Sequence, residues 1–253
     1  MQLESPVIAA PVGSATGLSP DLCRTASMVL CDLDGCLVAE GRAFPDAADF
    51  VSACGDRLWI VSNNSADTAR GLSSRLAGLG LSVPARRILL AGEQTLRHLA
   101  RSRPGARLSL YASPALSAVA RTAGFDEGGG PAEIALLCRD AGLTVETIGR
   151  LVTDIERGAM LWVSNTDIAH PGLNGQPIAE TGVLLAAVEA MRPGLAYGCI
   201  GKPDPFLLSL ALRAGGVAPE RTVFVGDNLD TDGDAARAAG VPFIHLVRRG
   251  GAA

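Results

Sequence analysis

The chain has 253 residues, with 22 basic and 26 acidic side chains and a formal net charge of −4 at pH 7. This balance excludes a surface built to neutralise a nucleic-acid backbone, and no apolar stretch approaches the roughly 20 residues of a membrane span. Because the N-terminus also lacks a signal-like pattern, we expect a soluble, cytoplasmic protein without nucleic-acid or membrane partners. The length fits one large α/β domain or a core with a smaller insertion.

After a lead-in at residues 1–25, whose Pro, Gly and Ser content predicts loose order, apolar and amphipathic stretches alternate. Short runs rich in β-branched residues, separated by stretches with apolar side chains at helical spacing, predict βαβ units around a parallel sheet. Core strands are expected at residues 28–32, 57–62, 197–200, 222–226 and 242–247, with helices at 66–79 and 205–214.

A second alternating block lies between residues 93 and 180 and contains neither an acidic cluster nor a phosphate-binding loop. Its expected elements are strands at 107–112, 133–138 and 159–163 and helices at 114–123 and 144–157. We therefore predict an inserted α/β domain over residues 93–180, with the core formed by residues 1–92 and 181–253.

Two carboxylates follow the first core strand, in the stretch Asp32-Leu33-Asp34-Gly35. They lie at the carboxyl end of a parallel strand, where open α/β folds bind ligands, and their spacing of two points both side chains the same way. Such acids repel each other unless a cation or shared proton intervenes, so one can be ionised while the other holds a proton. That division suits a nucleophile and a general acid; an ordinary acidic turn is the alternative.

A second acidic strand end, Gly226-Asp227, is followed closely by Asp230 and Asp232. Two acidic strand ends indicate a hard cation with oxygen ligands, most simply Mg²⁺, although solvated loop acids are the alternative. The six cysteines form no Cys-x-x-Cys pair, so we expect buried, reduced thiols rather than a metal or redox site.

Two further strand ends carry groups that suit an anion. The stretch Ser62-Asn63-Asn64-Ser65 offers a hydroxyl, amides and backbone N–H groups at the start of a helix, or simply caps that helix. Lys202, in Gly201-Lys202-Pro203, is the sole lysine of the chain. Because arginine stands at every other basic position, this site indicates a need for a compact ammonium rather than a planar guanidinium.

Strand ends carrying Asp/Asp, Ser, Lys and Asp in this order make the chain resemble the haloacid dehalogenase (HAD) superfamily over nearly its full length. The stretches DLDGCLVAEGRAFPDAADF, WIVSNNSADT, SNTDIAHPGLNG, IGKPDPF and VGDNLDTD are similar to the NagD or p-nitrophenylphosphatase branch. The resemblance implies a Rossmann-like core with a central parallel sheet and a smaller, inserted α/β cap domain. It also implies a phosphatase that acts on a small phosphorylated metabolite.

On this resemblance, Asp32 attacks phosphorus to form an aspartyl phosphate, and Asp34 acts as acid and then as base. The resemblance also implies that the phosphoryl oxygens are held by Ser62, Asn63 and Lys202. It implies that Mg²⁺ is bound by Asp32, the backbone carbonyl of Asp34 and Asp227. The metal site would be supported by Asp232 and Asn228. An aspartate at position 34 favours ester hydrolysis over dehalogenation, which needs no acid for the leaving group.

The resemblance also places candidate substrate contacts in the cap. They are Arg139 and Asp140 of the loop 138–143, and Asp167 and His170 of the returning segment, which also carries Asn165. For His170, an ordinary surface histidine before Pro171 is an equal alternative. Branch members often dimerise through their caps, which makes a homodimer one further expectation.

Two other functions stay open at this point. A phosphotransferase or mutase would use the same aspartyl phosphate but pass the phosphoryl group to an acceptor other than water. A phospholigand-binding module would retain the fold without turnover. The substrate also stays open among phosphoglycolate, pyridoxal phosphate, a nucleotide and a sugar phosphate.

Overall fold

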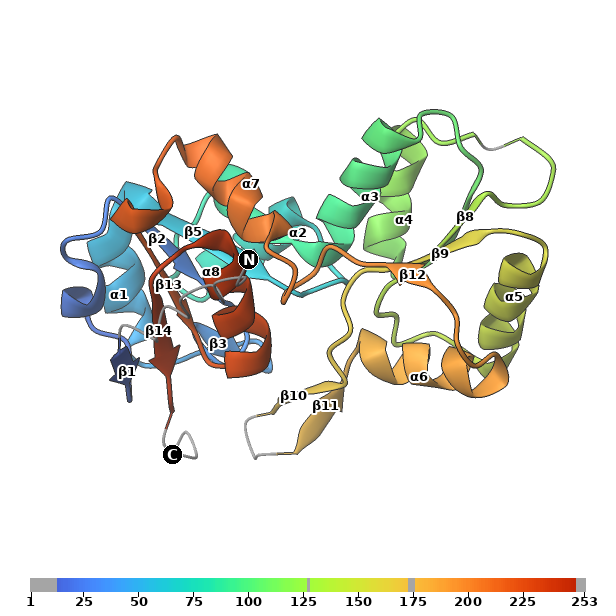
Figure 1. Ribbon diagram of the computed structural model, residues 1–253. Helices are drawn as coiled ribbons and strands as arrows, with labels where there is room; N and C mark the ends of the chain where they lie inside the picture. The colour runs from blue at the N-terminus through green and yellow to red at the C-terminus, as the bar shows by residue number, and fades with distance from the viewer. Residues whose placement is uncertain (1–12, 127, 173–175, 249–253) are drawn as a thin grey trace, which may run out of the picture.

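Figure 1 shows the computed structural model, which describes residues 13–126, 128–172 and 176–248, apart from the side chain of Pro171. Within these ranges the chain forms a six-stranded sheet, a four-stranded sheet and two short antiparallel hairpins. Among the same residues, no helix has the length and apolar character that crossing a bilayer requires.

The larger sheet has the strand order β1-β14-β13-β2-β5-β6, and all neighbouring strands are parallel. Side chains alternate along each strand, so Val29 and Cys31 of β2 face one layer of helices while Met28 and Leu30 face the other. The first layer is α1 (Ala47–Cys54) and α2 (Ala69–Gly78), and the second is α7 (Phe206–Gly215) and α8 (Asp234–Ala239). The strands are β1 (Gly13–Ala15), β2 (Met28–Cys31), β5 (Leu58–Ser62), β6 (Ile88–Leu90), β13 (Thr222–Gly226) and β14 (Phe243–Leu246).

The smaller sheet has the order β12-β9-β8-β7, again entirely parallel. Ile134 and Leu136 of β8 pack towards α3 and α4, whereas Ala135 and Leu137 pack towards α5 and α6, which lie on the opposite side of the sheet in Figure 1. The elements are α3 (Ala91–Ser102), β7 (Leu108–Tyr111), α4 (Pro114–Thr122), β8 (Ile134–Leu137), α5 (Val145–Glu156), β9 (Met160–Val163), α6 (Thr181–Met191) and β12 (Tyr197–Gly198).

One hairpin extends from each part of the molecule. The hairpin of β3 (Val38–Ala39) and β4 (Arg42–Ala43) follows β2, and that of β10 (Ala169–Pro171) and β11 (Pro177–Ala179) precedes α6. A Cβ atom added to Gly172 would lie 3.1 Å from Glu40 Oε1, so the two hairpins touch. Single helical turns connect other elements, at Pro20–Cys23, Gly55–Arg57, Ala85–Arg87, Pro219–Arg221 and Leu229–Gly233.

The predicted fold class, a parallel α/β core with a smaller α/β unit, is confirmed, but two assignments within it are wrong. The run at 197–200 was expected in the core sheet, whereas β12 pairs with β9 of the smaller sheet. The core was expected to resume at residue 181, yet Leu185 and Val188 of α6 pack against the smaller sheet. The chain therefore leaves the smaller sheet after β12. A short apolar run fits either sheet, so its pattern alone does not assign it.

The lead-in is also more ordered than predicted where the structure describes it. Gly13–Ala15 form β1, an edge strand that pairs with β14, and Cys23 is buried in the core beneath α1. Residues 1–12 of the predicted lead-in lie outside the described residues. The sequence pattern misses β1 because Gly-Ser-Ala carries no apolar alternation.

Candidate active site

The carboxyl ends of β2, β5 and β13 meet at one edge of the larger sheet, and the segment after β12 returns to the same place. Because the strands are parallel and adjacent, residues that follow them in the sequence come together in space. They enclose a cavity of about 70 Å³ that is covered on its far side by the β10–β11 hairpin. It is lined by Asp32, Asp34, Ser62, Asn63, Asn64, Asp167, Ala169, His170, Glu180, Lys202, Asp227, Asn228 and Thr231.

Lys202 lies at the base of this cavity, and its side chain is 2% exposed. Its Nζ atom is 2.8 Å from Asp32 Oδ1 and 2.6 Å from Asp232 Oδ1, and it donates to the Val61 carbonyl at 3.2 Å. Burial favours the neutral amine, but the charges of Asp232 and Asp32 outweigh it and hold the pKa of Lys202 above its ordinary range. A permanently charged ammonium therefore lies beside Asp32.

The other acids of the cavity are destabilised in their charged forms. Burial, with the nearby charge of Asp32, raises the pKa of Asp34 to about 6. Burial, with the charges of Asp32 and Asp232, raises the pKa of Asp227 to about 8. Lys202 alone does not neutralise this cluster, so a further positive charge would stabilise it.

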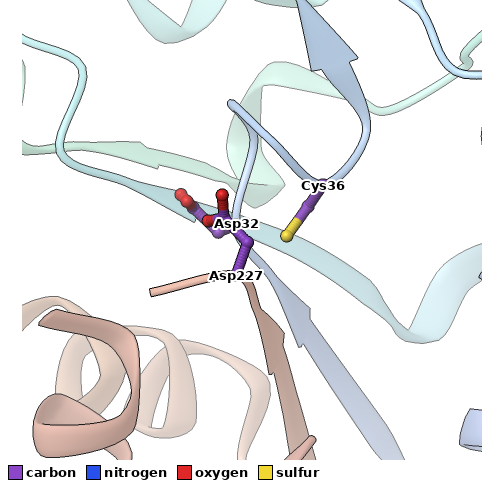
Figure 2. Close-up of side chains that lie close together, drawn as sticks. All are labelled: Asp32, Cys36 and Asp227. Atoms are coloured by element: carbon purple, nitrogen blue, oxygen red, sulfur yellow. The ribbon is translucent and has the colours of Figure 1, made fainter. Parts of the chain in front are cut away.

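A metal ion held by Asp32 and Asp227 would supply that positive charge. One carboxylate oxygen from each lies within 4.8 Å of the other and of the Cys36 thiol. Figure 2 shows how these three side chains lie close together. Gly35 permits this approach, because a Cβ atom there would overlap the Asp227 carboxylate. The two carboxylates suit a hard cation such as Mg²⁺, whereas the soft thiol of Cys36 does not, and burial raises its pKa. The donor set thus fits the predicted metal.

Asn63 fixes the position of Lys202 relative to β5. Its side-chain amide donates to the Lys202 carbonyl at 2.9 Å and accepts from the Lys202 N–H at 2.7 Å. The same amide donates to Asp167 Oδ2 at 3.0 Å. Next to it, the Ser62 hydroxyl accepts from the Asn64 N–H at 3.1 Å, so its own hydrogen remains available to an anion in the cavity.

Asn165 joins the returning segment to the core. It is fully buried, and its Nδ2 lies within hydrogen-bond distance of three acceptors that share its two hydrogens: the Asn63 carbonyl at 2.8 Å, Ser65 Oγ at 3.1 Å and Thr181 Oγ1 at 3.1 Å. A leucine of similar size would leave these acceptors without their donor in a buried place. Asn165 therefore holds the cap side of the cavity in register with β5.

We expect Asn165→Leu to lower the free energy of unfolding by about 2–4 kcal/mol, because buried acceptors lose their hydrogen bonds. Urea unfolding followed by circular dichroism measures this change. Gln176→Leu, an amide-to-leucine change at an exposed position, serves as the control and should shift stability by less than about 0.5 kcal/mol. Equal effects of the two substitutions would contradict the assigned role of Asn165.

Glu180 organises the cap side of the cavity. Its Oε1 atom is 2.9 Å from His170 Nδ1 and 3.2 Å from Arg139 Nε, which also donates to the Ala179 carbonyl at 3.0 Å. The hydrogen bond to Glu180 raises the pKa of His170, although burial opposes it. The negative charge of Glu180 is therefore paired with the Arg139 guanidinium and with the His170 imidazole when that ring is protonated.

Most of the site residues predicted from the sequence come together here, and two do not. Those that line the cavity are Asp32, Asp34, Ser62, Asn63, Asp167, His170, Lys202, Asp227 and Asn228, and Asp232 contacts Lys202 directly behind it. Arg139 and Asp140 lie outside its lining. The Arg139 guanidinium is held by Glu180, and the Asp140 carboxylate accepts from the Gly142 N–H at 2.9 Å within its own loop.

Two residues that the sequence analysis missed also shape the site. Glu180 carries no recognisable signal in the sequence, because its partners, Arg139 and His170, lie on other segments. Arg248 donates to the carbonyls of Gly35 and Cys36 and pairs with Asp46 at 3.0 Å, which fixes the loop that follows Asp34. These contacts join residues more than 200 positions apart, so no local sequence pattern predicts them.

Comparisons with known proteins agree with this arrangement. Residues 29–126 match the family model of haloacid dehalogenase-like hydrolases, and residues 199–253 match a second, HAD-hydrolase-like model. The dihydroxyacetone phosphatase of Corynebacterium glutamicum is 31% identical over 224 residues, 87% of this chain and 80% of that protein. The ribonucleotide monophosphatase NagD of Escherichia coli K12 is 27% identical over 226 residues, 88% of either chain. The p-nitrophenyl phosphatase structure from Archaeoglobus fulgidus aligns with a TM-score of 0.78 and 26% identity, covering 89% and 88% of the two chains. The likeness therefore spans both sheets.

Proposed function

This chain belongs to the haloacid dehalogenase-like hydrolases, in their NagD-like branch, and we propose that it hydrolyses small-molecule phosphate monoesters with Mg²⁺ as cofactor. The observation that carries the proposal is the enclosure of one small cavity by Asp32, Asp34, Asp227 and Lys202. An anionic nucleophile, a protonatable acid, a fixed ammonium and a pair of hard oxygen ligands are the groups that phosphoryl transfer requires.

In the first step, a carboxylate oxygen of Asp32 forms a bond to phosphorus while the bond from phosphorus to the ester oxygen breaks. Asp34 donates its proton to the departing oxygen. In the second step, Asp34 takes a proton from water, whose oxygen attacks phosphorus and releases phosphate and the Asp32 carboxylate. A pKa near 6 lets Asp34 serve both as acid and as base near neutral pH.

The phosphoryl oxygens are held by Lys202 and the Ser62 hydroxyl, and Asp232 keeps the ammonium in place. Asp32, Asp227 and the Asp34 backbone carbonyl would hold Mg²⁺, with Asn228 in support. The bound ion would offset the repulsion between the anionic nucleophile and the anionic substrate. The raised pKa of Asp227 supports this assignment, because its buried carboxylate gains most from a neighbouring cation.

We expect phosphate release from p-nitrophenyl phosphate in the presence of Mg²⁺, its loss after EDTA, and its return on adding Mg²⁺. A second readout does not depend on turnover. Mg²⁺ at about 100 times its dissociation constant should raise the melting temperature of the chelated protein by about 5–10 °C, because it binds only the folded state.

Asp227→Asn should abolish most of this thermal shift, whereas Asp230→Asn, which alters an exposed acid on the same loop, should preserve it. Equal shifts in both variants would contradict the metal site. The phosphate-release assay with p-nitrophenyl phosphate distinguishes hydrolysis from the two alternative functions. A phosphotransferase would transfer phosphate to an added alcohol instead of water, and a binding module would release none.

A further inference from the structure

Arg248 follows β14 and contacts the loop that comes after Asp34. Its Nε atom donates to the Gly35 carbonyl at 3.1 Å, and its Nη2 atom donates to the Cys36 carbonyl. The guanidinium also stacks on the Phe44 ring, 3.7 Å from the ring centroid. One largely buried side chain from the end of the last strand thus holds two consecutive peptide groups of this loop.

Asp46 fixes the orientation of this guanidinium. Its Oδ1 atom accepts from Nη2 of Arg248 at 3.0 Å, and its Oδ2 atom accepts from Nη1 at 3.1 Å. Asp46 stands at the N-cap position of α1, where an aspartate ordinarily caps the helix, yet its side chain makes no capping hydrogen bond. Its Oδ2 atom accepts instead from the Leu18 N–H at 2.7 Å. The carboxylate therefore holds Arg248 rather than the helix.

The loop that Arg248 holds carries groups of the proposed metal site. The Gly35 N–H donates to the Val38 carbonyl at 2.9 Å. Because a peptide group is planar, this bond also sets the direction of the Asp34 carbonyl, one of the proposed Mg²⁺ ligands. Gly35 also lies directly against the Asp227 carboxylate, with no room for a Cβ atom between them. A shift of Gly35 would therefore disturb both ligands.

We infer that Arg248 is a positioning residue for the proposed metal site: by fixing the loop after Asp34, it keeps the oxygen ligands from Asp34 and Asp227 at the spacing that Mg²⁺ requires. Mg²⁺ demands a nearly ideal arrangement of its ligands, so a small displacement weakens its binding. The charge of Arg248 has the opposite effect, because a nearby cation repels the metal. Loss of charge alone would tighten metal binding, whereas loss of position weakens it. This inference rests on the proposed function.

Binding of Mn²⁺, a hard cation that takes the same oxygen ligands as Mg²⁺, tests this inference without turnover. Electron paramagnetic resonance of free Mn²⁺ gives the dissociation constant of the chelated protein at a temperature well below unfolding. We expect Arg248→Met to raise that constant at least about tenfold. The Mg²⁺ concentration that gives half-maximal phosphate release should rise by a similar factor.

Arg248→Lys separates geometry from charge. It keeps a cation beside Asp46 but loses the planar fork of donors, so it should also bind Mn²⁺ more weakly than the native protein. Circular dichroism checks that each variant is folded at the temperature of the measurement. Because the lysine variant keeps the ion pair, it remains informative if Arg248→Met does not fold.

Arg57→Met is the matched control. Arg57 also donates to two backbone carbonyls, those of Cys23 at 2.8 Å and Ala26 at 2.7 Å. It precedes β5, however, and so lies at the opposite end of this strand from Ser62 and the cavity. Loss of its contacts should lower stability but change the dissociation constant for Mn²⁺ by less than about twofold.

Three results would overturn the inference. They are Mn²⁺ binding by Arg248→Met that is as tight as in the native protein or tighter, unchanged binding by Arg248→Lys, and equal weakening by Arg57→Met. In each case the native enzyme still binds metal and releases phosphate, so the proposed function stands. A native protein that neither binds Mn²⁺ nor releases phosphate would instead overturn the proposed function, and this inference with it.

Discussion

Asp32→Asn is expected to lower kcat for phosphate release at least about 10⁴-fold, because the amide cannot form the bond to phosphorus. The variant should stay folded, since it removes one of several crowded acids and leaves Lys202 paired with Asp232. Steady-state phosphate release measures the loss, and circular dichroism checks the fold. Native enzyme quenched in acid during turnover should also carry a phosphoryl group on the peptide that contains Asp32.

Asp49→Asn, an exposed acid in the first turn of α1, provides the matched control and should retain full activity. Residual activity within about tenfold of the native value in Asp32→Asn would contradict covalent catalysis by this residue. So would a phosphorylated peptide from another part of the chain.

Lys202→Met is expected to lower the free energy of unfolding by about 3–5 kcal/mol and to remove phosphatase activity. The ammonium is buried between Asp32 and Asp232, and its loss leaves two carboxylates close together without a counter-charge. Chemical denaturation in the presence of EDTA measures the stability without a contribution from metal. Arg24→Met, which removes an exposed cation, should change stability by less than about 0.5 kcal/mol.

A double variant separates the two effects of Lys202. Adding Asp232→Asn to Lys202→Met removes one uncompensated charge and should restore part of the stability, but none of the activity. Unchanged stability in the single variant would contradict the burial and pairing described for this side chain. Restored activity in the double variant would contradict its role in holding the phosphoryl group.

The sequence predicted the larger sheet well where strands are long and apolar. The observed bounds lie within one or two residues of the expected ranges for β2, β5, β13 and β14. Short runs of β-branched residues between polar segments rarely adopt any structure other than a strand. β6 was missed because Ile88–Leu90 is too short to show a pattern. β12 was found but assigned to the wrong sheet, since hydrogen-bonded partners depend on contacts distant in the sequence.

The core side of the site was predictable for a simple geometric reason. Residues at the carboxyl ends of adjacent parallel strands must meet, so Asp32, Ser62 and Asp227 needed no knowledge of the rest of the fold. The cap side was harder to predict because the docking of two separate sheets decides which cap residues reach the cavity. Arg139 was predicted to contact the substrate, but it pairs with Glu180 outside the cavity, and Glu180, for which no prediction was made, lines the cavity instead.

Because Lys202 is the only lysine in the sequence, the active-site cavity can be observed by a signal from this one side chain. Isotope labelling restricted to lysine places one side-chain reporter in the chain, and its burial beneath Asp32 slows exchange of its protons with solvent. A magnetic resonance spectrum of that ammonium would then contain one signal. Its shift would follow occupancy of the cavity without any background from the rest of the protein.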